Sequence, residues 1–292
     1  MAAVVALLVV LVVVKLTSGG GAAVGGNASG SGRGAPARPS IAPPALVRQV
    51  AEVPSSVFDA VGTSGNPPPF TVASHQRLLG SGGRPEVVYV GAEYCPYCAL
   101  LRYSLVAALG RFGTFPRLAT TVSGDSDGRI PTFSFYGSSY SSPYLAFTPV
   151  EEYGRSEPPR VLEPLSKRVS GLLERYERPP FASSQGIPFL DIGNRYLAVG
   201  VPRYLATLFY DQTTGRFGPL DDGGPGRSAI ASAVHAPASP LGRSIDAAAF
   251  IVEANYVSAA ICSLDGSRPK AVCGSSGVRK AALALAAERP VG

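Results

Sequence analysis

The fold is decided by the stretch from Glu86 to Ala99, which reads EVVYVGAEYCPYCA. Its first part, 86–90, is an apolar run rich in β-branched residues that follows a Gly-rich turn at 80–83, which predicts a buried strand. Apolar residues then recur with helical spacing from Ala99 to Phe112. The Cys95-Pro96-Tyr97-Cys98 motif therefore lies where a strand passes into a helix.

This position suits dithiol chemistry, which needs a thiolate near neutral pH. A cysteine in the first turn of a helix gains that form from the helix dipole and the free backbone N–H groups. Cys95 is expected to be exposed and to attack, and Cys98 to resolve the mixed disulfide. Pro96 fits the first turn, where a missing N–H is harmless. Taken alone, the motif is also compatible with half a zinc site or a structural disulfide.

The rest of the chain predicts an α/β protein. A hairpin is expected around Gly193-Asn194, between strands at 187–192 and 196–199. Further strands are predicted at 129–136 and 143–150, and helices at 161–176, 228–234, about 244–262, and from Ser275 or Ser276, either of which can act as the N-cap.

The segment Gly186 to Tyr196 reads GIPFLDIGNRY, and its X-Pro pair at the start of a strand can accommodate a cis bond. Together with strand-CPYC-helix, it resembles the thioredoxin superfamily, especially the extracytoplasmic DsbA-type oxidoreductases. The resemblance implies a thioredoxin-like fold over 45–292, with a helical insertion and additional C-terminal helices.

The resemblance also implies roles for individual residues. Cys95 would be the nucleophile, Cys98 the resolving thiol and Pro188 the cis-proline that faces them. The backbone of Ile187 would pair with substrate, which would also contact Pro96 and Tyr97. Thioredoxins keep a buried carboxylate under the dithiol for proton transfer. That role has no assignment from the sequence, although Glu86 and Glu93 are nearby, Glu93 being expected in a loop.

A narrower resemblance is to the uncharacterised membrane-tied family called domain of unknown function 929. It is carried by residues 89–99 (YVGAEYCPYCA), 111–115 (RFGTF), 131–135 (PTFSF) and 254–262 (ANYVSAAIC), and it extends roughly from Ala45 to the C-terminus. This family supplies no function of its own.

The second cysteine pair, Cys262 and Cys273, is separated by a turn-rich loop. Paired cysteines suit an oxidising compartment, where this pair is expected to form a structural disulfide. A redox relay with Cys95 and Cys98 is one alternative. A four-cysteine zinc site is another, although the gap is wide for a zinc knuckle.

The N-terminus is hydrophobic. Residues 4–14 are an unbroken apolar run, short of the roughly 20 residues that a spanning helix needs. We expect residues 1–18 to be a transmembrane anchor or a signal segment. The anchor is favoured, a cleaved signal peptide is the first alternative, and a segment that is neither of the two is the second. Residues 19–44 are rich in Gly, Ala, Ser and Pro and are expected to be a flexible linker. Lys15, Arg33 and Arg38 all follow the apolar run, which disagrees with the positive-inside rule for a translocated domain, but long domains translocate largely regardless of such charges.

Composition limits the partners. The net charge of +6 is spread along the chain, so nucleic acid is not expected as a partner. Two His and one Met leave little material for metal or haem ligation, and we expect no metal and no cofactor.

We expect a single-pass protein of the cell membrane whose extracytoplasmic domain is a thiol-disulfide oxidoreductase. Its partners would be protein thiols or disulfides and a membrane or extracytoplasmic redox partner. The alternatives are a non-catalytic binding or scaffold protein with structural disulfides, and a zinc module.

Overall fold

The computed structural model describes residues 38–124, 128–211, 216–217, 226–237 and 247–292. The expected anchor at 1–18 and most of the expected linker lie outside these residues. The end of the linker segment is instead structured, because Ser40–Ile41 forms strand β1 and helix α2 (Pro44–Ala51) begins inside it. No helix among the described residues combines the length and the hydrophobicity needed to cross a membrane.

The central sheet is built on β4 (Arg84–Ala92). One neighbour, β7 (Ala146–Tyr153), runs parallel to β4, and the other, β8 (Phe189–Ile192), runs antiparallel. The sheet continues from β8 through β9 (Tyr196–Val199) to β2 (Thr71–Val72), while the short β3 (Gly80–Ser81) pairs with the start of β4. The β8–β9 hairpin turns at Gly193 and Asn194, both with positive φ, as predicted.

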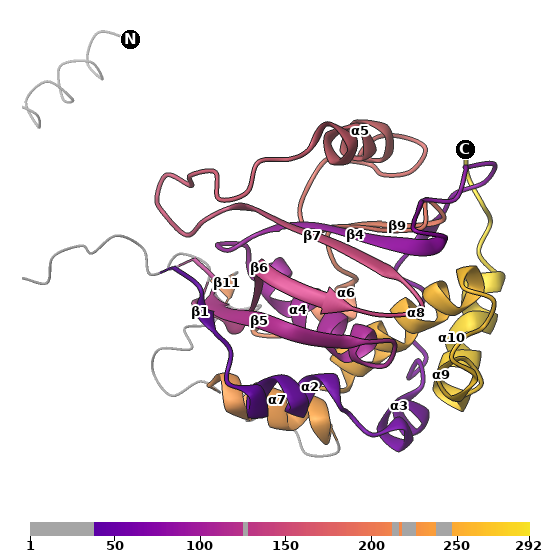
Figure 1. Ribbon diagram of the computed structural model, residues 1–292, viewed down its shortest axis with the longest axis horizontal. Coiled ribbons are helices and arrows are strands. Elements are labelled where there is room, and N and C mark those ends of the chain that lie inside the picture. Colours follow the sequence, from indigo (N-terminus) through magenta and orange to yellow (C-terminus); the bar gives the residue numbers. More distant parts are fainter. Residues whose placement is uncertain (1–37, 125–127, 212–215, 218–225, 238–246) are drawn as a thin grey trace, which may run out of the picture. The chain divides into compact units, whose positions relative to one another are not determined.

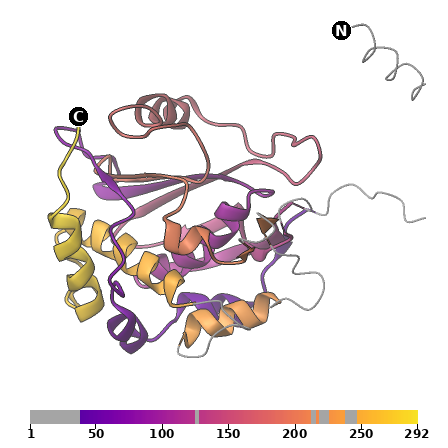
Figure 2. The same cartoon turned by 180° about the vertical axis from the view of Figure 1, so that it is seen from behind.

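Helices cover both faces of this sheet (Figure 1). Helix α5 (Lys167–Tyr176) packs on one face, where its Val169 belongs to the same buried apolar cluster as Val88 and Val90 of β4. Helices α4 (Pro96–Gly110) and α8 (Ala248–Leu264) lie on the other face, and Figure 2 shows the same layers from behind. Because α4 is enclosed by the sheet and by other helices, nearly all of its side chains are buried.

A separate three-stranded sheet has the order β1-β5-β6, and two of its strands, β5 and β6, lie between α4 and β7 in the chain. It contains β6 (Pro131–Ser141), where a strand was predicted at 129–136, and β5 (Thr114–Val122), which was not predicted. The sequence of β5 hides the strand, because Pro116 lies inside it, at a shift in its register with β6. Helix α5 follows later, between β7 and β8.

The predicted helix at 161–176 begins later than expected. Ser166 is its N-cap and accepts a hydrogen bond from the backbone N–H of Val169 at 3.3 Å. Pro164 is incompatible with a helix interior, and Val161 instead forms an isolated bridge with Tyr153. The remaining described elements are α3 (Ser55–Val61), α6 (Arg203–Ala206), β10 (Tyr210–Asp211), β11 (Arg216–Phe217), α7 (Arg227–His235), α9 (Lys270–Cys273) and α10 (Ser276–Ala286).

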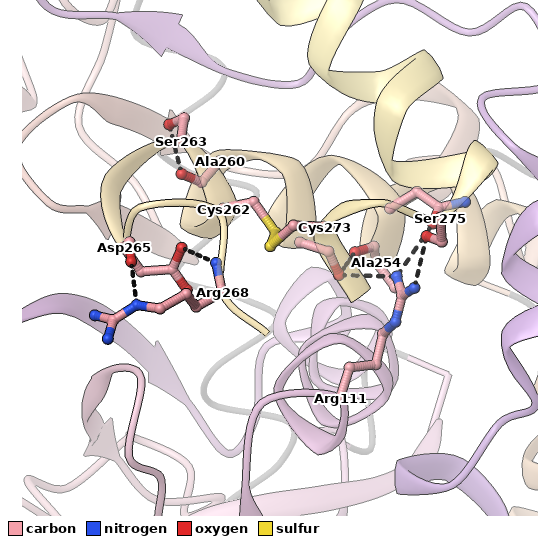
Figure 3. The surroundings of a disulfide bond; sticks show 11 residues. Arg111, Ala254, Ala260, Cys262, Ser263, Asp265, Arg268, Cys273 and Ser275 are labelled. Atoms are coloured by element: carbon pink, nitrogen blue, oxygen red, sulfur yellow. Dashed lines mark hydrogen bonds between the residues drawn. A yellow bond between two sulfur atoms is a disulfide. The ribbon is translucent and has the colours of Figure 1, made fainter. Parts of the chain in front are cut away.

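Cys262 and Cys273 form a disulfide that joins the end of α8 to the end of α9, in agreement with the predicted pairing (Figure 3). Ser275 occupies the N-cap position of α10, but its side chain makes no capping hydrogen bond. Its hydroxyl accepts a hydrogen bond of 3.1 Å from Arg111, which follows α4. The start of α10, just after the disulfide-bonded Cys273, is thus hydrogen-bonded to the residue that follows the helix carrying the CxxC motif.

Removing this disulfide is expected to destabilise the protein by about 3 kcal/mol, because the bond closes a short loop in the unfolded chain. The test is urea unfolding of the Cys262→Ala/Cys273→Ala variant beside the wild type without reductant. Wild type treated with reductant is the control, and it should lose a similar amount. An unchanged free energy of unfolding in the double variant would contradict the prediction.

Glu253 is a buried carboxylic acid in the middle of α8, and its Oε2 accepts a hydrogen bond of 2.6 Å from the hydroxyl of Tyr204. Burial raises the pKa of Glu253 to about 7, although the hydrogen bond from Tyr204 opposes this shift. Between pH 4.5, the usual pKa, and about 7, the native state therefore holds a proton that the unfolded chain releases. The stability due to this group is present below that window and is lost as the pH rises through it.

The Glu253→Gln variant is expected to lack this loss. The free energy of unfolding of the wild type should fall relative to that of the variant by roughly 1–3 kcal/mol between about pH 5 and about pH 8. Urea unfolding at several pH values measures the difference. Glu52→Gln, at an exposed carboxylate, is the control and should follow the wild type. Parallel curves for wild type and Glu253→Gln would show that the prediction is wrong.

Candidate active site

Cys95 and Cys98 lie at the junction between β4 and α4, and neither is disulfide-bonded. Cys95 is the N-cap residue of α4, and its sulfur accepts a hydrogen bond of 3.1 Å from the backbone N–H of Cys98. Pro96 is the first helical residue, so no N–H is lost there. The amino end of a 15-residue helix therefore points at the sulfur of Cys95, which favours a negative charge on it.

The two cysteines differ in their surroundings. Cys98 is fully buried, and burial, followed by the neighbouring Cys95, raises the pKa of its thiol well above the usual value. Cys95 was expected to be exposed, but 3% of it is accessible, among Tyr94, Tyr153 and Ile187. Cys95 is thus the thiol closer to solvent, although a reaction partner must displace or press against these side chains to reach it.

The loop before β8 faces Cys95. The Ile187–Pro188 peptide bond is cis, and the Cys95 thiol donates a long hydrogen bond, 3.9 Å, to the carbonyl oxygen of Ile187. The backbone N–H of Ile187 has no hydrogen-bond partner among the described residues. Two segments separated by about ninety residues in the sequence are therefore brought together at one sulfur atom.

A buried ion pair, absent from the sequence-based predictions, lies close to the dithiol. Arg102 is one helical turn beyond Cys98 on α4, and Glu151 lies on β7 opposite Gly91 of β4. The guanidinium donates two hydrogen bonds to the carboxylate, at 2.9 and 2.6 Å, and a third to the carbonyl of Ala92 at 2.8 Å. Both side chains are fully buried, so each charge depends on the other.

The charges of this pair act on the cysteines and on each other. Burial disfavours the charged form of Arg102 and so lowers its pKa. Glu151 and other neighbouring groups favour the charged form more strongly, and the pKa of the guanidinium is raised well above its usual value. Burial raises the pKa of Glu151 to about 7, against the effect of Arg102. Arg102 also lowers the pKa of Cys98, and Glu151 raises it, although burial has the larger effect.

Two further polar side chains adjoin the pair. Glu93 is buried directly after β4, and one of its carboxylate oxygens accepts a hydrogen bond from Ser134 of β6. Tyr89 directs its hydroxyl over Gly91, where a Cβ atom would come within 2.1 Å of the hydroxyl oxygen. The Oε2 of Glu93 and the hydroxyl of Tyr89 have no hydrogen-bond partner among the described residues. Glu86, the other carboxylate near the motif in sequence, does not adjoin this ion pair. It pairs instead with Arg168 of α5, whose side chain is 48% exposed.

The sequence did contain a signal for the ion pair. Arg102 stands in a helix whose neighbouring residues are apolar, and Glu151 stands within a strand. A charge in such a segment is rarely buried without a partner, so Arg102 required one. The sequence did not show which carboxylate would provide it.

The fold and site define a mixed α/β protein with a CxxC motif at the amino end of a buried helix. Residues 70–185 match the model of a family described as "Domain of unknown function (DUF929)". The matched segment contains both cysteines, Arg102 and Glu151, and it is shorter than the resemblance seen in the sequence, which extended to the C-terminus. No curated protein and no solved structure matches the chain.

Proposed function

We propose that this protein is a thiol-disulfide oxidoreductase with a thioredoxin-like domain, in which Cys95 and Cys98 form the redox pair. The observation that carries the proposal is the position of the Cys95 sulfur, between the amino end of α4 and the loop containing Pro188. The β4–α4–β7 unit supports it, because a CxxC motif at a strand-helix-strand unit is typical of thioredoxin-like redox sites.

The proposed reaction has two exchange steps. The Cys95 thiolate attacks one sulfur of a substrate disulfide, forms a mixed disulfide and releases the other substrate sulfur as a thiolate, which takes up a proton. Cys98 then loses its proton and attacks the Cys95 sulfur, which releases the second substrate thiol. The substrate gains two electrons, the protein dithiol becomes a disulfide, and the reverse sequence oxidises a substrate dithiol.

The Arg102–Glu151 pair has a positioning role in this proposal. Because Cys98 is fully buried, its proton leaves with difficulty, and the nearby Arg102 stabilises the thiolate that remains. Glu151, with a pKa of about 7, can exchange a proton near neutral pH. We propose that Glu151 is the buried carboxylate that could not be assigned from the sequence. It lies on β7, which runs parallel to β4, the strand that leads to Cys95.

We place the domain outside the cell membrane, tethered by the N-terminal apolar segment. The Cys262–Cys273 disulfide supports this compartment, since such bonds persist in oxidising environments. A topology reporter fused to the C-terminus is expected to be active on the outer side of the membrane. A reporter active only in the cytoplasm would overturn the placement without affecting the redox chemistry.

The redox function is tested by equilibrating purified protein with glutathione redox buffers and trapping free thiols by alkylation. Cys95 and Cys98 are expected to interconvert between dithiol and disulfide, and the reduced protein is expected to reduce a model protein disulfide. A protein in which these cysteines never form a disulfide, and which exchanges with no disulfide, would overturn the proposal.

The low exposure of Cys95 favours a second candidate, a binding or scaffold protein in which this cysteine pair is structural. The reduction potential separates the two. Catalytic pairs have potentials between about −270 and −120 mV, whereas structural disulfides lie below about −300 mV. We expect a value in the catalytic range for Cys95 and Cys98.

A further inference from the structure

Three aromatic rings form a row that begins inside the CxxC motif. The ring of Tyr97 meets that of Phe217 edge to face, with centroids 5.2 Å apart, and Phe217 meets Tyr210 in the same way at 5.4 Å. Tyr210 and Phe217 are directly opposite each other in the antiparallel β10–β11 pair, so their side chains share one face of that ribbon. We call Tyr97, Phe217 and Tyr210 the aromatic ridge.

The ridge is accessible to a partner. Tyr97 is 36% exposed and Tyr210 is 37% exposed, and they are connected through the partly buried Phe217. The other large apolar side chains that are exposed in the described part of the chain stand on separate elements or loops: Ile41, Leu78, Val161 and Leu283. Connected exposed apolar groups, unlike isolated ones, mark interaction sites.

The ridge adjoins the reactive sulfur. Tyr97 is two residues from Cys95, and Cys95 is itself packed against Tyr94, Tyr153 and Ile187. A disulfide that reaches this recessed sulfur must bring the residues beside its own cysteine against these side chains. Successive residues of an extended peptide are about 3.3 Å apart along the chain, so a neighbour of the substrate cysteine comes within reach of Tyr97.

We infer that the aromatic ridge binds a large apolar side chain next to the substrate cysteine, so that the site prefers protein segments with apolar flanks over polar or small disulfides. This inference rests on the proposed oxidoreductase function and specifies its substrate class. The N–H of Ile187, which has no hydrogen-bond partner in the described part of the chain, can pair with the backbone of the same segment, while the ridge contacts its side chain.

The test compares two mixed-disulfide peptides of equal length and charge, one with phenylalanine and one with glycine beside the cysteine. Rates of reduction by the reduced full chain are measured for wild type, Phe217→Ala, Tyr210→Ala and the control Leu283→Ala, which removes an exposed leucine of α10. Wild type and Leu283→Ala are expected to prefer the phenylalanine peptide roughly tenfold, which corresponds to about 1.4 kcal/mol. In the two ridge variants the ratio is expected to fall towards one.

Each outcome decides a separate point. Equal rates for both peptides in the wild type, or an unchanged preference in the ridge variants, would overturn the inference while leaving the redox function in place. No reaction of the wild type with either peptide or with oxidised glutathione would overturn the redox function itself. Should Phe217→Ala not fold, the exposed Tyr210→Ala substitution still tests the ridge, with circular dichroism as the check on folding.

Discussion

Replacing Cys95 by serine is expected to abolish thiol–disulfide exchange, because a serine hydroxyl neither ionises near neutral pH nor forms a disulfide. Replacing Cys98 by serine is expected to stop the reaction one step later. Cys95 can still attack the substrate in that variant, but its mixed disulfide is no longer resolved. Turnover should fall at least about 10³-fold in both variants. The roles proposed for the buried Cys98 and the helix-capping Cys95 can therefore be separated by experiment.

The two variants are distinguished by trapping. After incubation with a disulfide-bonded protein and alkylation, mass spectrometry should find a covalent adduct in Cys98→Ser and none in Cys95→Ser. The Cys262→Ala/Cys273→Ala variant, which lacks the disulfide between α8 and α9, is the matched control and should turn over like the wild type. An adduct at Cys98 in the Cys95→Ser variant would show that the assigned order of attack is wrong.

Replacing Glu151 by alanine is expected to lower the free energy of unfolding by about 3–5 kcal/mol, because it leaves the charge of Arg102 buried without its partner. Replacing both residues, as Arg102→Met/Glu151→Leu, is expected to restore most of this loss, since no charge is then buried at this position. Chemical unfolding of the single and double variants measures both effects. Glu174→Ala is the control, because that glutamate is exposed on α5, and it should change the free energy of unfolding by about 0.5 kcal/mol or less.

A second measurement separates an electrostatic effect on the dithiol from a loss of packing. The charge of Glu151 raises the pKa of Cys98, so Glu151→Gln, which keeps the shape and leaves Arg102 charged, should lower it. The pH dependence of Cys98 alkylation in the Cys95→Ser background reports this change. An unchanged profile would limit the pair to a structural role.

Local sequence was sufficient to locate the dithiol. The strand at 86–90 and the helix after Cys95 follow from short-range patterns, and so does the β8–β9 hairpin with its Gly193-Asn194 turn. Strand β5 was missed because Pro116 interrupts its pattern, and pairing with β1 and β6 maintains the strand despite that residue. The start of α5 was predicted too early, at 161, because the apolar residues have helical spacing from there. Pro164 is incompatible with a helix interior, and α5 begins only after it, at Lys167.

The sequence by itself determined the local setting of the CxxC motif, because an N-cap cysteine followed by proline depends on a few adjacent residues. Tertiary structure alone decided what surrounds it. Arg102 and Glu151 are 49 residues apart, and Tyr97 meets Phe217 through contacts between distant segments. Hydrophobic periodicity encodes which face of an element is buried, whereas the partner of a buried charge or ring depends on which elements pack together. Cys95, expected to be exposed, is for the same reason enclosed by Tyr94, Tyr153 and Ile187.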